Sequence, residues 1–209
     1  MLEISSVSIV LNEAPYIESW IDYHRDRFGE MIIIDGGSTD NTVELIEAKG
    51  IIPFYKEWKR DYSLQRNFSI EKANFDWVFV LDVDHRVSDE LSGRFSEFIV
   101  NQNHYCYEVP FIHYVNGLEV GRNHYMNFFK KSSGIKYWRN VHEGVCDKHG
   151  YAVKDWMTLP DDCCVRHIKD IYQYEKSLKN WISYGEEDGR FTEGSAAEEL
   201  AQMRRLLGL

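Results

Sequence analysis

The sequence predicts an α/β fold in which helices cover both faces of a mostly parallel sheet. Short apolar runs rich in β-branched residues alternate with amphipathic stretches through the first half of the chain, a pattern typical of parallel sheets. The run WVFVL at residues 77–81 is apolar at every position, as expected of a strand buried on both faces. After residue 101 the pattern changes to strands separated by Gly- and Ser-bearing turns, which predicts a mixed α+β second half.

In the first half, turn and capping residues mark where the expected elements begin and end. Pro15 suits the first turn of a helix that Gly29 closes, Gly50 stops a short helix, and Ser88 caps another. The expected strands are residues 5–11, 31–34, 51–55 and 77–81. The expected helices are residues 15–28, 43–49, 63–73 and 89–99.

The second half is expected to contain three strands and two helices. The strands are residues 105–111, 124–129 and 135–141, and the helices are residues 171–182 and 196–207. A polar, Gly-rich stretch separates the two helices and reads as a linker. The chain is expected to form one domain with halves at residues 1–101 and 102–185, followed by a linker and helix at 186–209.

The charge and cysteine content exclude several classes of protein. A formal net charge of -10 argues against a nucleic-acid surface, which needs clustered Lys and Arg. An acidic protein that handles phosphate groups needs a few placed basic side chains or a divalent cation. The cysteines are expected to be buried, reduced thiols, because none has the spacing of a metal or redox motif. They are Cys106, Cys146, Cys163 and Cys164.

The chain has no candidate membrane segment. No stretch approaches the roughly 20 apolar residues that cross a bilayer. Asn12 and Glu13 interrupt the first apolar run before a secretory signal could form. We therefore expect a cytoplasmic protein without a membrane span.

Polar side chains follow three strands of the predicted sheet. In open α/β sheets, ligands bind beyond the carboxyl ends of the strands. Asn12 and Glu13 follow the first strand, Asp35 ends the second, and Asp82 and Asp84 follow the fourth. Taken singly, Asn12, like Asp40 nearby, is better explained as a helix cap or Asx turn. Together these side chains predict a binding site at one sheet edge.

The Asp82-Val83-Asp84 sequence is the sharpest chemical signal. Two carboxylates directly after an apolar strand need compensation, which Mg²⁺ or Mn²⁺ bound with substrate phosphates would supply. The same spacing marks haloacid-dehalogenase-type phosphohydrolases, in which the first Asp is a nucleophile. That class expects Thr or Val where this chain has Arg86, and it usually carries the motif near the N-terminus. The phosphohydrolase is therefore the lower-ranked alternative.

Read together, four stretches resemble successive motifs of family-two glycosyltransferases with the GT-A fold, the Rossmann-like fold of nucleotide-diphospho-sugar transferases. They are SIVLNEAPYIESWIDYH, IIIDGGSTDNTVELI, QRNFSI and DWVFVLDVDHRVSDEL, and they resemble most the branch with a Leu-Asp-Ala-Asp-Glu signature. NVHE at residues 140–143 and CVRHIK at 164–169 match less closely. At a much weaker level, the whole chain is similar to the N-terminal segment of a multidomain chlorella-virus glycosylation protein.

The resemblance implies roles for individual residues. Arg66 would contact base or phosphate, Asp82 would face the ribose and the metal, and Asp84 would bind the metal directly. The nucleotide base and ribose would be held by Leu11, Asn12, Glu13 and Asp35. The chain departs from the commonest pattern at Gly36, where a second Asp is frequent, and at His85, where the branch often has Glu.

Two residues of the second half complete the expected site on physical grounds. An inverting transfer needs a general base within hydrogen-bond reach of the acceptor hydroxyl. Glu143 is the candidate, with Asp161 and Asp162 in reserve, although each is also explained as a solvated loop carboxylate. His167 follows an apolar pair and is a candidate third metal ligand or a buried structural histidine.

The leading hypothesis is a metal-dependent inverting glycosyltransferase. Residues 1–101 would bind a nucleoside diphosphate sugar, with uridine as the expected nucleoside, and residues 102–185 would bind a glycan or other hydroxyl-bearing acceptor. A hexose-type sugar would be transferred with the help of Mn²⁺ or Mg²⁺. The alternatives are the phosphohydrolase and a non-catalytic module that binds nucleotide sugars or glycans.

Overall fold

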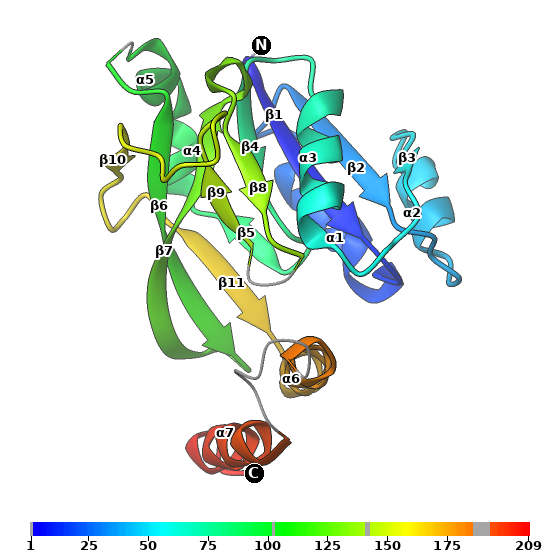
Figure 1. Ribbon diagram of the computed structural model, residues 1–209. Coiled ribbons are helices and arrows are strands. Elements are labelled where there is room, and N and C mark those ends of the chain that lie inside the picture. The colour runs from blue at the N-terminus through cyan, green and yellow to red at the C-terminus, as the bar shows by residue number, and fades with distance from the viewer. Residues whose placement is uncertain (1, 102, 141–142, 186–192) are drawn as a thin grey trace. The chain divides into compact units, whose positions relative to one another are not determined.

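The computed structural model describes residues 2–101, 103–140, 143–185 and 193–209 (Figure 1). By its internal packing the chain divides into two compact units. The first unit comprises Met1–Phe111 and Asn123–Arg166, and the second comprises Ile112–Arg122 and His167–Leu209. The proposed division at residue 101 and the functional role of each half remain predictions.

The main sheet begins with the parallel strands that the apolar runs predict. β1 (Ile4–Val10) pairs in parallel with both β2 (Glu30–Asp35) and β4 (Trp77–Val80). β3 (Phe54–Tyr55) extends this arrangement at the edge of the sheet. Because the strands are parallel, the ends of β1, β2 and β4 lie along one edge, where Asn12, Asp35 and Asp82 follow.

The remaining strands make the second half mixed, as predicted. They are β6 (Cys106–Val115), β7 (Leu118–Lys130), β10 (Met157–Thr158) and β11 (Val165–Lys169), and β5 (His85–Val87) of the first half joins the same sheet. The strand order is β3-β2-β1-β4-β7-β6-β11-β5, with β10 beside β6. β7 runs antiparallel to β4, and a separate antiparallel pair joins β8 (Lys136–Trp138) to β9 (Gly144–Cys146).

Two helices of the first unit begin at side-chain caps, of which Ser88 was predicted and Asp61 was not. Asp61 accepts a hydrogen bond from the Leu64 N–H at the start of one helix, and Ser88 accepts one from the Leu91 N–H at the start of another. The helices are α1 (Ala14–His24), α2 (Thr42–Ala48), α3 (Tyr62–Lys72), α4 (Asp89–Gly93) and α5 (Phe95–Val100). The expected helix 89–99 breaks after Gly93, whose lack of a side chain disfavours helix continuation.

Two apolar cores fill the two faces of the parallel strands. α1 and α3 lie on opposite faces of the sheet in Figure 1. On one face Ile33 and Phe79 pack with Trp20 of α1, and on the other Ile34 and Val78 pack with residues of α3. Neighbouring residues of each strand therefore enter different cores, which explains why these runs are apolar throughout.

Several boundaries differ from the sequence-based prediction. β3 contains only two of the five residues expected in that strand, and β8 ends at Trp138 rather than at residue 141. β5, β9, β10 and β11 were not predicted, because each is only two to five residues long, and β5 also directly follows the acidic motif. The sequence pattern does not reveal the partner strands that create these short pairings. Most of the expected linker, residues 186–192, and residues 141–142 of NVHE lie outside the described part of the chain.

The second unit contains α6 (Ile171–Gly185) and α7 (Glu193–Leu206). Its small core consists of Val115, Ile171 and Met203 with partly buried apolar neighbours. The Asn116 side chain accepts a hydrogen bond from the Ile171 N–H, which fixes the start of α6 against the turn after β6. No helix among the described residues is long and apolar enough to cross a membrane.

We predict that Phe79→Ala lowers the free energy of unfolding by about 3–5 kcal/mol, because it leaves a cavity among aromatic rings. Phe79 is fully buried and contacts Phe28, Phe95 and Phe128. Urea denaturation followed by circular dichroism measures the change. Ile52→Ala is the control, since Ile52 is 83% exposed. A loss for Phe79→Ala no larger than that of the control would contradict this account of the core.

Candidate functional site

The first strand end is held by side-chain bonds to the loop after β2. Asn12 has a positive φ of 57°, and its Oδ1 accepts a hydrogen bond from the Thr39 N–H at 2.7 Å. Asp40 accepts hydrogen bonds from the Ala14 N–H and from Thr42. Asp40 thus forms the expected Asx turn with Thr42, whereas Asn12 connects two loops, and neither residue caps a helix. These bonds hold the ends of β1 and β2 together.

Asp35 lies at the end of β2 and is 5% exposed. Its carboxylate accepts the Gly37 N–H at 2.9 Å and the Ser38 N–H at 3.2 Å, which fixes the turn after the strand. Gly37 has a φ of 105°, which favours glycine. A Cβ on Gly36 would lie 3.3 Å from both the Trp58 Cβ and the Val10 carbonyl oxygen. This close approach explains why Gly suits the position where the family often has Asp.

Arg66 of α3 connects two carboxylates that are far apart in the sequence. Its Nη1 and Nη2 donate to the two oxygens of Asp82 at 2.8 and 3.0 Å, a bidentate pair. Its Nε donates to Glu143 Oε1 at 2.6 Å. The guanidinium carbon also lies 5.6 Å from the centre of the buried Tyr137 ring. The structure thus brings together three of the predicted site residues.

The charges of this cluster support one another. Burial opposes ionisation of Asp82, but the Arg66 guanidinium outweighs it and holds the Asp82 pKa below its ordinary value. Burial likewise disfavours charge on Arg66, and the Asp82 and Glu143 carboxylates overcome this and raise the Arg66 pKa. Arg66 therefore stays a cation and Asp82 an anion at neutral pH.

Asn67, the next residue of α3, attaches the hairpin that carries Glu143. Its side-chain amide donates to the Tyr137 carbonyl and accepts from the Tyr137 N–H, both at 2.9 Å. The Tyr62 N–H adds a bond to the Asn140 carbonyl. These contacts fix β8 on α3, so that Arg66 can reach Glu143.

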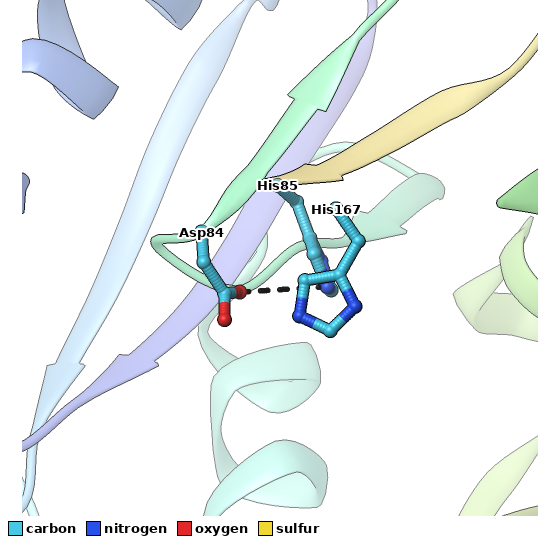
Figure 2. Close-up of side chains that lie close together, drawn as sticks. All are labelled: Asp84, His85 and His167. Atoms are coloured by element: carbon cyan, nitrogen blue, oxygen red, sulfur yellow. Dashed lines mark ion pairs between the residues drawn. The ribbon is translucent and has the colours of Figure 1, made fainter. Parts of the chain in front are cut away.

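A second cluster contains Asp84, His85 and His167. Each offers a possible ligand atom, and these atoms all lie within 4.8 Å of one another (Figure 2). Asp84 Oδ1 is 3.6 Å from His85 Nε2, the contact marked by a dashed line in the figure. His167 belongs to β11, directly after Val165 and Arg166. Carboxylate oxygen and imidazole nitrogen are ligands that suit Mn²⁺.

The hydrogen bonds of His85 restrict its role in this cluster. Its Nδ1 accepts the Asp82 N–H at 2.9 Å, so that nitrogen has no proton and its lone pair is occupied. The ring proton is therefore on Nε2, the nitrogen that faces Asp84. With its proton on Nε2, His85 has no lone pair there to offer a metal, and its 3.6 Å contact with Asp84 is longer than a hydrogen bond.

The model of glycosyl transferase family 2 matches residues 5–155 of the chain. The chain belongs to this family. The match covers the parallel strands, α3 with Arg66, the acidic residues after β4 and the hairpin with Glu143. The resemblance to family-two glycosyltransferases is confirmed, and the weaker likeness to a viral protein stays a prediction.

Two bacterial relatives of the chain are named as glycosyltransferases. The chain is 30% identical over 140 residues to the prophage-derived glycosyltransferase SunS of Bacillus subtilis, covering 65% of this chain and 33% of SunS. It is 34% identical over 102 residues to the lipopolysaccharide core biosynthesis glycosyltransferase LpsC of Rhizobium meliloti, covering 47% of this chain and 37% of LpsC. The chain thus spans about a third of the length of these relatives.

The solved structure of TarS from S. aureus has a similar fold. Its TM-score is 0.57 at 14% identity, and the match covers 96% of this chain and 42% of TarS. A complex of TarS residues 1–349 with UDP matches with a TM-score of 0.53 at 14% identity, covering 99% of this chain and 72% of that one. The predicted GT-A fold is confirmed.

The site of this family-two chain contains most of the predicted residues in two groups. Asp82 faces Arg66 and Glu143, whereas Asp84 lies with His85 and His167. Leu11 and Glu13 follow β1, and the Glu13 N–H donates to Thr42 Oγ1. Asp161 and Asp162 are exposed in the turn before β11. The ligand and catalytic roles assigned to these residues remain predictions.

The sequence reasoning missed Asn67, which attaches β8 to α3, and the hydrogen bond from the Asp82 N–H to His85. Asn67 lies within the QRNFSI stretch beside Arg66, where its amide could have suggested a backbone contact. Nothing in the sequence indicates that Tyr137 is its partner, because that pairing spans 70 residues.

We predict that Asp82→Asn lowers the free energy of unfolding by about 1–2 kcal/mol at pH 7, an effect limited by partial exposure of the pair. Because the folded-state pKa of Asp82 is lowered, its stabilisation is present above the ordinary value of 3.8 and is lost as pH falls below it. The difference between wild type and variant should therefore shrink between pH 5 and about pH 3. Urea denaturation across this range tests it.

Asp26→Asn is the matched control for this measurement, since Asp26 is exposed on the surface. It should change stability little at any of these pH values. A constant difference between wild type and Asp82→Asn down to the lowest pH would remove the assigned pairing.

Proposed function

We propose that this protein is a metal-dependent inverting glycosyltransferase that transfers a hexose-type sugar from a uridine diphosphate donor to an acceptor hydroxyl. The observation that carries the proposal is the pair of clusters after β4 in a family-two fold: Arg66 with Asp82 and Glu143, and Asp84 with His167. The names of SunS and LpsC, and the UDP bound by TarS, support it.

Asp84 and His167 would hold the cation. One carboxylate oxygen and one imidazole nitrogen fit Mn²⁺ better than Mg²⁺, which prefers oxygen ligands. The bound cation would neutralise the diphosphate as it leaves. Asp84 would supply the anionic ligand.

Arg66 and Asp82 would bind the nucleotide side of the donor. A carboxylate has about four acceptor positions, so the bidentate pair with Arg66 leaves Asp82 able to accept ribose hydroxyls. Asp35 would recognise a uracil base by accepting a hydrogen bond from its imide N–H. Its carboxylate already accepts two backbone hydrogen bonds, which hold it in place. Leu11, Asn12 and Glu13 would line the same nucleotide position.

Glu143 would act as the general base. Its side chain is 15% exposed, and Arg66 holds Oε1, which orients the carboxylate and leaves Oε2 for the proton of an acceptor hydroxyl. The acceptor oxygen would then attack the anomeric carbon in line with the departing diphosphate. Direct displacement from the opposite side inverts the configuration of that carbon.

The geometry disfavours the phosphohydrolase alternative. That mechanism needs the first Asp of the motif as a nucleophile. In this chain both oxygens of Asp82 are bound to Arg66, which lowers the pKa of the carboxyl and makes it a poorer nucleophile. A non-catalytic binding module would bind the donor without releasing UDP, so the experiments below separate it from the enzyme.

We predict that donor binding depends on the cation and favours uridine. Calorimetry with Mn²⁺ should show UDP and thymidine diphosphate binding more tightly than GDP or ADP, because only the former bases present an imide N–H and a small ring. Excess chelator should abolish measurable UDP binding, since Asp82 and Asp84 would otherwise repel the diphosphate. Undiminished binding in chelator would defeat the metal assignment, and a purine preference would defeat the role of Asp35.

Asp84→Asn provides the matched variant for the same titration. It nearly preserves side-chain volume and removes the ligand charge, so UDP affinity with Mn²⁺ should fall while the unfolding free energy changes little. Asp89→Asn, at an exposed position of α4, should leave UDP affinity unchanged. Equal affinities for Asp84→Asn and wild type would exclude Asp84 as a ligand.

We predict that Glu143→Gln keeps donor affinity but slows transfer by about 10²-fold or more, the scale for loss of general-base assistance. Release of UDP from a panel of UDP-sugars with candidate acceptors measures the rate, and calorimetry measures the affinity. Asp161→Asn is the control, because Asp161 is an exposed loop carboxylate. If Glu143→Gln transfers sugar at the wild-type rate while Asp161→Asn does not, the base has been assigned to the wrong residue.

A further inference from the structure

The hairpin of β8 and β9 has two exposed residues at the end that carries Glu143. The hairpin lies along α3 (Figure 1). Trp138 pairs with Gly144 across the hairpin, so Arg139 and Glu143, one residue further along each strand, lie at the same end. Trp138 is 47% exposed, and Arg139 is exposed as well. All of these residues belong to the first unit of the chain.

The Arg139 guanidinium is stacked on the Trp138 ring. Its central carbon lies 3.9 Å from the centre of the ring, which is a cation–π contact. The indole in turn packs against Gly144, where an added Cβ would lie 3.3 Å from the indole Nε1. The missing side chain at residue 144 therefore leaves room for the indole. The guanidinium is held on a supported ring rather than on a freely moving one.

Arg139 adopts a backbone conformation that favours glycine. Its φ is 74°, in the left-handed region. In a regular strand its side chain would lie on the same face as that of Tyr137, which is buried near Arg66. The positive φ interrupts this alternation, and the guanidinium lies on the exposed Trp138 ring instead. Strained conformations of this kind are concentrated at functional sites.

The charge of Arg139 is not neutralised within the described part of the chain. No described residue forms an ion pair or a side-chain hydrogen bond with it, and Glu143 binds Arg66 instead. The whole protein has a net charge of -10, so an anionic ligand needs a cation placed at its binding site. A planar guanidinium presents paired N–H donors that fit the oxygens of a phosphate or a carboxylate.

We propose that Arg139, held on Trp138, binds an anionic group of the acceptor, which makes the acceptor a sugar or polyol that carries a phosphate or a carboxylate. The proposal rests on the proposed function, in which Glu143 takes the proton of the acceptor hydroxyl. Facing positions of an antiparallel hairpin lie about 5 Å apart, so the two side chains can contact two groups of one small acceptor. Arg66 is already bound to Asp82 and Glu143.

The test compares anionic with neutral acceptors on the full chain. Several hexoses are each offered as the neutral sugar, the 6-phosphate and the uronic acid, with Mn²⁺ and a panel of UDP-sugars. UDP release gives kcat/KM for each acceptor. An anionic member should exceed its neutral parent by about 10- to 100-fold, the scale of a hydrogen bond to a charged group. A preferred 6-phosphate identifies a phosphate as the anion, and a preferred uronic acid identifies a carboxylate.

Arg139→Gly separates recognition of the anion from folding. Glycine suits a φ of 74°, so the unfolding free energy should stay close to that of wild type. The preference for the anionic member should fall about 10- to 100-fold, because the guanidinium is lost. Arg25→Gln is the matched control, since Arg25 is an exposed arginine on the other side of the sequence motif region and should keep the preference.

The outcomes separate this inference from the proposed function. If Arg139→Gly lowers kcat/KM equally for neutral and anionic acceptors, the residue only supports the hairpin, and the proposal is overturned. Weaker UDP binding by this variant in calorimetry would assign the guanidinium to the donor diphosphate and would also overturn it. UDP release by wild type without any anionic preference keeps the proposed function and removes the inference. No UDP release from any donor removes both.

Discussion

The Arg66 guanidinium is the interaction on which the arrangement of the site depends. It neutralises Asp82 at the end of β4 and binds Glu143 on a hairpin that follows much later in the chain. Neither carboxylate could be kept partly buried without such a partner, because an unpaired buried charge is costly. A single cation on α3 therefore links the parallel half of the fold to the hairpin, and Asn67 strengthens the same connection through the Tyr137 backbone.

The two carboxylates of the acidic motif have different partners. Asp82 is committed to the Arg66 pair, and Asp84 faces His85 and His167. The intervening Val83 is buried, and it turns the two carboxylates toward different surroundings. The His85 ring serves both: its Nδ1 receives the Asp82 N–H and its Nε2 faces Asp84. The departure of this chain from a Glu at position 85 thus has a structural explanation, since an imidazole offers an acceptor and a donor on opposite edges.

The loops at the ends of β1 and β2 stiffen the nucleotide side of the site. Asn12 and Asp40 use their side chains to bind backbone groups of the neighbouring loop, and Asp35 does the same within its own turn. The consequence is a rigid edge in which carboxylates are already held in place before a ligand arrives. Such preorganisation reduces the ordering cost of binding.

The sequence by itself determined the parallel strands, the family and the identity of most polar residues in the site. Apolar periodicity, the cap at Ser88 and the acidic motif are local signals, and each can be recognised from a short stretch of sequence. Only the tertiary structure decided which partners meet: Arg66 with Glu143 across 77 residues, and His113 with His167 across 54. No local pattern encodes these pairs, because they form where the packed sheet and hairpin bring distant segments within hydrogen-bond distance. The short strands β5 and β9 likewise form only by pairing with strands that are distant from them or follow a loop.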